Sequence, residues 1–125
     1  MSETEIESGI LVSLEDMHPS SPYFKHGISI RVTGRLQDYT ERTNTAVLVD
    51  GSSELKINTQ HIRGIDFRVG SIYQFIGDLF IETDNEATLL ARLGRNVDGI
   101  DLSLYHQTLQ LLRRFQADLL KNPSA

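Results

Sequence analysis

The side chains that could carry out chemistry lie far apart along this sequence of 125 residues. There is no cysteine, which excludes thiol nucleophiles, disulfides and cysteine-ligated zinc. The four histidines fall in separate segments, without the short spacings that bring two imidazoles onto one metal ion: His18, His26, His61 and His106. The carboxylates that could form a pair for general acid–base catalysis are Asp66, Asp78 and Glu82. We expect these side chains to lie on a solvent-exposed strand face instead. The sequence predicts no enzyme, no metal and no cofactor.

Basic residues on the outer faces of the expected strands are candidates for contacts with DNA phosphates, with a solvated surface as the alternative: Arg31, Arg35, Lys56, Arg92 and Arg95. The chain as a whole is acidic, with 12 Lys and Arg against 17 Asp and Glu and a net charge of −5. Free-standing nucleic-acid-binding domains usually have the opposite sign. Single-strand-binding proteins also stack bases on aromatic rings, and residues 40–66 contain no Phe, Trp or Tyr. We therefore expect weak or assisted DNA binding at most.

The length is typical of one domain. We expect residues 1–8 to form a frayed acidic N-terminus and residues 9–125 to form a single domain. No apolar run approaches the roughly 20 residues of a membrane helix. The N-terminus lacks the basic and apolar regions of a secretory signal. Together with the absence of cysteine, this favours a reducing compartment.

The elements that must position these side chains are mostly strands. Strict alternation predicts a half-buried strand over 27–36, with even-numbered residues inward. Further strands are predicted over 45–50, 54–58, 69–83 and 88–97, with Asp50-Gly51 as a hairpin turn. In the last strand we expect Leu93 to point inward. Before the first long strand we expect a short strand within 9–14 and a connector over 15–25 that places Tyr23 and Phe24 in the core. We also expect a loop over 39–44. The segment 59–68 is compatible with a helical turn.

Two glycines fall on inner strand faces, Gly34 and Gly77. A glycine at such a position marks a bend where a sheet curls. Five strands with two such bends and a closing helix predict a mainly β protein, a five-stranded OB-fold Greek-key barrel with a C-terminal α-helix. An SH3-like barrel is the alternative, although it seldom ends in so long a helix.

The C-terminal helix is predicted over 101–121, with Asp101 as its N-cap and Pro123 beyond its end. Its apolar residues cover an arc of about 180°, wider than the roughly 100° stripe that covers a core. One edge carries Leu102, Tyr105, Leu109, Leu112 and Leu119, and the other carries Leu104, Leu111 and Phe115. We expect one edge to close the barrel end and the other to meet a partner helix. The alternative is a helix sunk into its own barrel. His106 falls on the polar side, where we expect it to be solvated.

Residues 31–36 (RVTGRL), 69–79 and 97–102 resemble the Ten subunit family of the CST telomere complex, over about residues 27–115. The connector Pro19-Ser-Ser-Pro22 is similar to the plant form of this family. The helix start at 101–105 is also similar to the smallest subunit of replication protein A, which is a structural cousin. The resemblance strengthens the OB-fold prediction.

The resemblance implies a noncatalytic nuclear subunit at chromosome ends. In that family the small protein pairs with a larger OB-fold protein, the Stn subunit, partly through their C-terminal helices. The trimer with the Ctc subunit binds single-stranded telomeric DNA, restrains telomerase and helps DNA polymerase α to fill in the complementary strand. Carried onto this sequence, the partner-binding residues are Tyr105, Leu109, Leu112 and Phe115, together with Leu119. Two alternatives stay open, the small structural subunit of a replication protein A-type trimer and a free-standing OB-fold ligand binder or enzyme.

Overall fold

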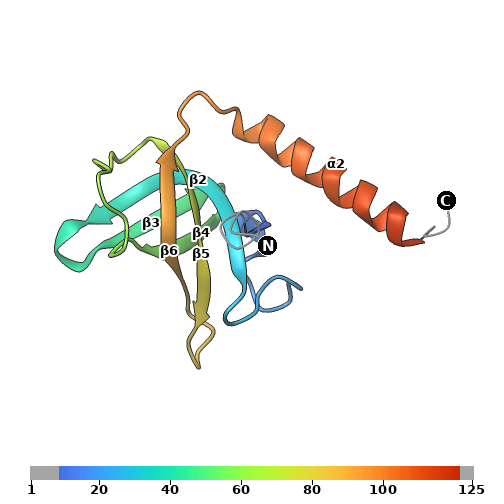
Figure 1. Ribbon diagram of the computed structural model, residues 1–125, viewed down its shortest axis with the longest axis horizontal. Coiled ribbons are helices and arrows are strands. Elements are labelled where there is room, and N and C mark those ends of the chain that lie inside the picture. Colours follow the sequence, from blue (N-terminus) through green and yellow to red (C-terminus); the bar gives the residue numbers. More distant parts are fainter. Residues whose placement is uncertain (1–8, 122–125) are drawn as a thin grey trace.

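The computed structural model describes residues 9–121, with side chains described through residue 118. It consists of a curled β-barrel and a C-terminal helix that projects from it (Figure 1). The elements, in chain order, are β1 (Ile10–Leu11), the 3₁₀ turn η1 (Leu14–Asp16), β2 (Ser29–Thr40), the 3₁₀ turn η2 (Glu41–Thr43), β3 (Thr45–Asp50), β4 (Ser53–Asn58), β5 (Ile72–Ile81), β6 (Ala87–Asn96) and α2 (Leu102–Lys121). Within these residues, no helix combines the length and apolar character needed to cross a bilayer.

Five strands close the barrel in the order β2, β3, β4, β6, β5 and back to β2. The long strand β2 makes this closure possible, because residues 29–35 pair with β5 and residues 35–40 pair with β3. Strands β4 and β6 pair in parallel, and the other barrel pairs are antiparallel. This is the Greek-key order of the OB-fold, so the predicted fold class is confirmed.

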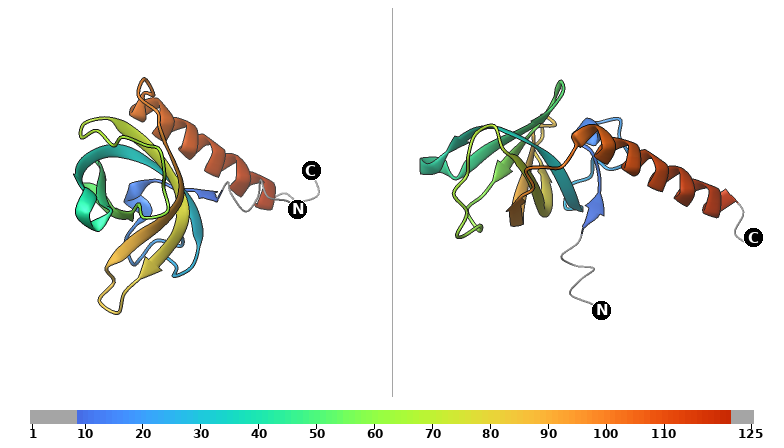
Figure 2. Two further views of the ribbon diagram at one scale, coloured as in Figure 1. Left: turned by 60° about the vertical axis from the view of Figure 1, so that its left-hand side comes forward. Right: turned by 90° about the horizontal axis from the view of Figure 1, so that it is seen from above.

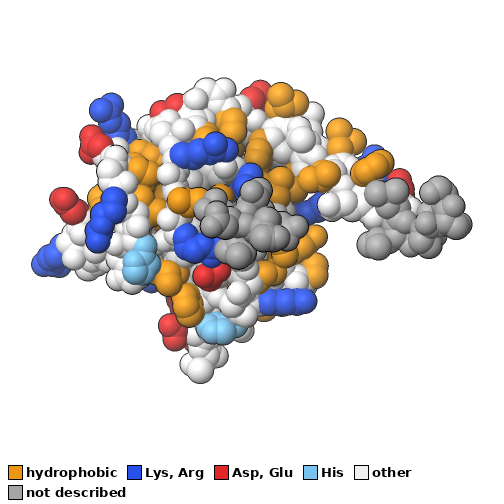
Figure 3. Space-filling model, viewed as in Figure 1, with side chains coloured by type: hydrophobic (Ala, Val, Ile, Leu, Met, Phe, Trp, Pro, Cys, Tyr) orange, Lys and Arg blue, Asp and Glu red, His pale blue; other side chains and the backbone are white. Residues whose placement is uncertain are grey.

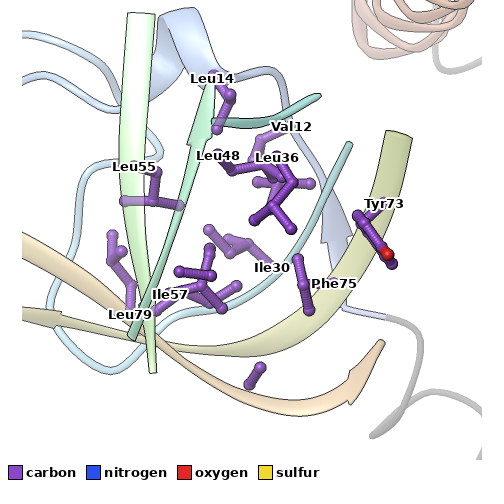
Figure 4. Close-up of a cluster of buried hydrophobic side chains, with 14 residues drawn as sticks. Val12, Leu14, Ile30, Leu36, Leu48, Leu55, Ile57, Tyr73, Phe75 and Leu79 are labelled. Carbon is purple, nitrogen blue, oxygen red and sulfur yellow. The ribbon is translucent and has the colours of Figure 1, made fainter. Parts of the chain in front are cut away.

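Alternating residues of all five strands fill the barrel interior, as the close-up shows (Figure 4). Among them, Ile30, Val32, Phe75 and Leu79 have no solvent exposure. The predicted inner faces of the first and fourth barrel strands are therefore confirmed. The connector before β2 also behaves as predicted, since Tyr23 and Phe24 pack against this core.

The two glycines on the inner faces lie where neighbouring strands approach too closely for a side chain. A Cβ on Gly34 would lie 2.9 Å from both the Leu48 side chain and the Val49 carbonyl oxygen. A Cβ on Gly77 would lie 2.1 Å from the Leu90 carbonyl oxygen. Any other residue at Gly77 therefore requires β5 and β6 to move apart.

A bulge in β6 contradicts the predicted position of Leu93. Ile76 pairs with Leu93 but the next residue, Gly77, pairs with Ala91, so that Arg92 is an extra residue in β6. An extra residue reverses the alternation beyond it. The Leu93 side chain consequently points outward and is 46% exposed.

The ends of two other segments differ from the sequence prediction. Strand β2 continues through Thr40, past its predicted end at Leu36, because a second irregularity at Gln37 lets it go on pairing with β3. Residues 59–68 contain turns and no helix. The first difference arises because pairing between strands, rather than local sequence preference, decides where β2 ends.

Candidate interaction surfaces

Helix α2 contacts the barrel through one side only. Its N-cap is Asp101, as predicted, with Oδ1 accepting hydrogen bonds from the backbone amides of Ser103 and Leu104 at 3.0 and 3.2 Å. Leu109 is buried, and Tyr105 is half-buried beside Thr33 and Arg31 on the outer face of β2. Burial raises the pKa of the Tyr105 phenol, and Thr33 and Arg31 act in the opposite direction. Figure 2 shows that the rest of the helix extends away from the barrel.

An ion pair and a histidine–carboxylate contact flank Leu109 on this barrel-facing side. The Arg113 Nη2 atom lies 2.7 Å from Asp16 Oδ2, and the guanidinium lies 4.5 Å from the centre of the Tyr23 ring. The His106 Nε2 atom pairs with Asp50 Oδ2 at the end of β3. The prediction that His106 is solvated is therefore wrong, because this side of the helix crosses the β3–β4 turn instead of facing water.

The Asp16 ion pair gives stability a defined pH dependence. Burial raises the pKa of Asp16, but hydrogen bonds from Arg113 and Ser13 and the Arg113 charge outweigh it, and the net pKa lies below the ordinary value of 3.8. The stability that Asp16 contributes is then present above pH 3.8 and is lost as pH falls through the lowered pKa. We expect Asp16→Asn to lower the melting temperature at pH 7 and to have a smaller effect below pH 3. Calorimetry of both proteins across this range measures the difference, and equal losses at both pH values would contradict it.

The opposite side of α2 exposes large apolar side chains, and hydrophobic groups follow the helix in Figure 3. Leu104, Leu111 and Phe115 are 59%, 62% and 61% exposed, and Leu112 beside them is 42% exposed. Thr108 completes the row, with its hydroxyl donating to the Leu104 carbonyl at 2.9 Å. Residues 104, 108, 111 and 115 are spaced by four, three and four, the repeat of a coiled-coil seam. We call Leu104, Thr108, Leu111, Leu112 and Phe115 the apolar stripe.

The structure places the predicted partner-binding residues on two different sides of α2. Leu112 and Phe115 belong to the apolar stripe. Tyr105 and Leu109 contact the chain's own barrel, and the side chain of Leu119 lies outside the described residues. One edge of the apolar arc is free, as predicted, although Leu112 is exposed beside it instead of lying with Tyr105 and Leu109. The heptad spacing is the signal that would have assigned Leu104 and Leu111 to the free edge.

Three of the predicted phosphate-contacting residues lie near one another on the outer face of β2, β5 and β6. Arg31 and Arg95 line a groove of about 390 Å³ floored by Ile76, Leu93 and Gly94. Gln74 lies between them and accepts a 2.9 Å hydrogen bond from Arg95. Arg92 lies further along β6 and forms a 2.6 Å ion pair with Asp78. In Figure 3, basic and hydrophobic side chains alternate on the face shown.

The other two predicted residues lie elsewhere. Arg35 donates a 2.6 Å hydrogen bond to the Gly70 carbonyl and does not line this groove. Lys56 is on β4, in a hollow that it shares with Glu54, Asp84 and Glu86. OB-folds commonly bind nucleic acid on this part of the barrel, between the loops at either side. The carboxylates around Lys56 make that surface unfavourable for phosphates.

No group of three or more metal-ligating side chains converges within the described part of the chain. The described surfaces offer apolar side chains for burial on α2 and positively charged side chains in the groove.

Residues 5–119 match the model of a family described as the telomere-capping CST complex subunit Ten1. The chain belongs to this family. It is 54% identical to the CST complex subunit TEN1 of Arabidopsis thaliana over 116 residues, which are 92% of this chain and 91% of that protein. The resemblance of the sequence to the plant form is thus confirmed.

Solved structures agree with this Ten1 chain in fold. A chain in the Stn1–Ten1 complex of Schizosaccharomyces pombe superposes with a TM-score of 0.69 at 21% identity, over 86% of this chain and 94% of that one. Ten1 from the same organism gives the same TM-score and identity, over 86% of this chain and 99% of its own. At this identity the similarity establishes the OB-fold barrel.

Proposed function

We propose that this Ten1 chain is a noncatalytic subunit that pairs with the Stn subunit, a larger OB-fold protein, through the apolar stripe of α2. The observation that carries the proposal is the heptad-spaced row of exposed side chains on a helix whose other side already contacts the barrel. Apolar patches of this kind on a folded domain mark protein interfaces. The similar S. pombe structure is a complex of Stn1 with Ten1, which makes Stn the first partner to test.

The energetics of the stripe support a helix as the partner. Each Leu or Phe side chain that is fully removed from water contributes about 1.5–3 kcal/mol. A second helix packed along residues 104–115 would cover several of these side chains at once, with ridges and grooves meeting at a shallow crossing angle. Phe115 lies at the end of the described row and is the aromatic anchor of the interface.

Family membership supports a wider role for the chain in this proposal. With the Stn and Ctc subunits, the chain would act in the nucleus at chromosome ends, where the complex protects single-stranded telomeric DNA, restrains telomerase and supports lagging-strand fill-in. In this proposal the chain itself supplies structure, and DNA affinity comes mainly from the assembled complex. The groove with Arg31 and Arg95 would contribute phosphate contacts only within that assembly.

Co-expression with the Stn subunit tests the pairing. We expect a stable 1:1 complex by size-exclusion chromatography, and no complex with the middle subunit of replication protein A under the same conditions. Binding to the replication protein instead would favour the alternative scaffold.

The isolated chain is expected to bind single-stranded DNA negligibly. Its net charge is −5, and the usual OB ligand surface is acidic around Lys56. Base stacking is worth about 1–3 kcal/mol per base, and the phosphate contacts that remain without it are weak and salt-sensitive. Fluorescence anisotropy with a telomeric oligonucleotide at physiological salt should show no saturation below the micromolar range. Submicromolar binding by the pure chain would contradict this prediction.

A further inference from the structure

We infer that Arg113 is a positioning residue, which fixes the direction in which α2 presents the apolar stripe. The inference rests on the proposed function for its effect on partner binding, but the geometry itself belongs to the chain alone. Arg113 lies two residues after Leu111, which is about 200° around a helix. Its contacts therefore hold the side of α2 opposite the stripe, so that they can orient the stripe without covering it.

Helix α2 needs such a contact because little else holds it. It follows β6 through residues 97–101, where Gly99 has a φ of +96° and the chain turns sharply. Leu109 is the last fully buried residue among the described side chains of the helix. The helix continues to Lys121, which is about 18 Å beyond Leu109 at 1.5 Å per residue. Without a contact beyond Leu109, this part of the helix could pivot about the leucine.

Arg113 makes its contacts one turn beyond Leu109 and joins three separate segments. It forms the ion pair with Asp16, its Nη2 atom lies 3.4 Å from the Leu11 carbonyl oxygen as a donor, and its guanidinium stacks on Tyr23. Arginine suits this role because its planar guanidinium can stack on a ring while its edge donates to a carboxylate. The contacts come from β1, η1 and the connector, and together they limit both the tilt and the roll of the helix.

The barrel side of this contact is itself fixed. Asp16 Oδ2 accepts a 2.8 Å hydrogen bond from the Ser13 backbone amide and a weaker one from the Ser13 hydroxyl. Leu14, at the start of η1, is 2% exposed and belongs to the barrel core. The position of the Asp16 carboxylate is thus fixed relative to the barrel core. The ion pair between Asp16 and Arg113 therefore fixes the helix relative to the core as well.

A second polar contact, between His106 Nε2 and Asp50 Oδ2, holds the helix on the other side of Leu109. It lies one turn before Leu109 and anchors the first half of α2 to the β3–β4 turn. After loss of Arg113, the remaining contacts of α2 span about one turn, from Tyr105 to Leu109, so that a small shift there becomes a large displacement at the far end of the helix. We therefore expect loss of Arg113 to widen the range of angles that the helix adopts, with its first turns still attached to the barrel.

The chain has no cysteine, so two spin labels can be placed without background. Labels at Lys56→Cys on β4 and Ala117→Cys on α2 report the angle of the helix in the isolated chain by double electron–electron resonance. We expect a narrow distance distribution for the parent and a broadened one for Arg113→Gln. Arg113→Lys, which keeps a positive charge beside Asp16 and a donor for the Leu11 carbonyl, should narrow the distribution again in part. Arg114→Gln, on the adjacent exposed arginine, is the matched control and should leave the distribution unchanged.

The same variants are then measured for affinity to the Stn subunit. We expect Arg113→Gln to weaken binding by about tenfold, with the loss partly recovered in Arg113→Lys and absent in Arg114→Gln. An unchanged distance distribution in Arg113→Gln overturns the inference, as does broadening with unaltered affinity. If the parent does not bind Stn, the proposed function fails, while the distance measurement still decides whether Arg113 positions the helix.

Discussion

Replacing Gly77 with glutamate is expected to leave no stably folded protein at 37 °C. The Cβ alone would lie 2.1 Å from the Leu90 carbonyl oxygen and 2.8 Å from Ala91 Cα, and no side-chain rotamer relieves a clash with backbone. The carboxylate would also enter the core between Phe75 and Leu79 without a partner. Burying an unpaired charge costs several kcal/mol, while a domain of this size has about 5–15 kcal/mol of total stability. Circular dichroism melting and the yield of soluble protein measure the effect.

A matched control separates this clash from the added charge. Phe80→Glu places the same side chain on the same strand, at an outward position that is 43% exposed. We expect its melting temperature to remain within a few degrees of the parent. Gly77→Ala, which adds only the Cβ, should already be destabilised. A Gly77→Glu protein with an unchanged melting temperature would mean that the close contact between β5 and β6 is absent in solution.

The fold was predictable from local pattern wherever a strand alternates without interruption. The inward residues around Ile30 and Phe75 follow directly from period-two alternation, and the start of α2 follows from Asp101 as N-cap. These features depend on interactions between residues near one another in sequence. The close approach at Gly77 was visible only as a glycine on an inner face, because its cause is the carbonyl of Leu90 on the neighbouring strand.

Features set by distant contacts were not predictable. The bulge at Arg92 reverses the direction of Leu93, and nothing in residues 88–97 signals the extra residue. A helical wheel places His106 on the polar side of the helix and predicts that it is solvated. The wheel contains no information about the barrel, and so it does not show that Asp50 contacts His106. The apolar stripe was partly predictable, because a wide apolar arc shows that one edge is left over. Assigning Leu109 to the barrel required the position of the helix itself.

Glutamate at both Leu111 and Phe115 is expected to abolish co-purification with the Stn subunit and leave the barrel folded. The two side chains are more than 60% exposed, so their replacement removes little that stabilises the isolated chain. In a helix–helix interface they would be central anchors, each worth about 2 kcal/mol or more. Losing both corresponds to about 4 kcal/mol, or nearly a thousandfold in Kd. Isothermal titration calorimetry and circular dichroism of the same preparations measure the two effects separately.

Ser103→Glu with Gln110→Glu is the matched control, because both residues are exposed on α2 and lie about 80–100° around the helix from Leu111. It adds the same two charges on the polar side of α2, outside the apolar stripe. We expect this control to bind Stn with parental affinity. If the Leu111 and Phe115 variant stays folded and binds as tightly as the control, the stripe is not the interface. If it unfolds, these side chains stabilise the barrel in solution, and the partner must contact another surface, of which the groove at Arg31 is the first to test.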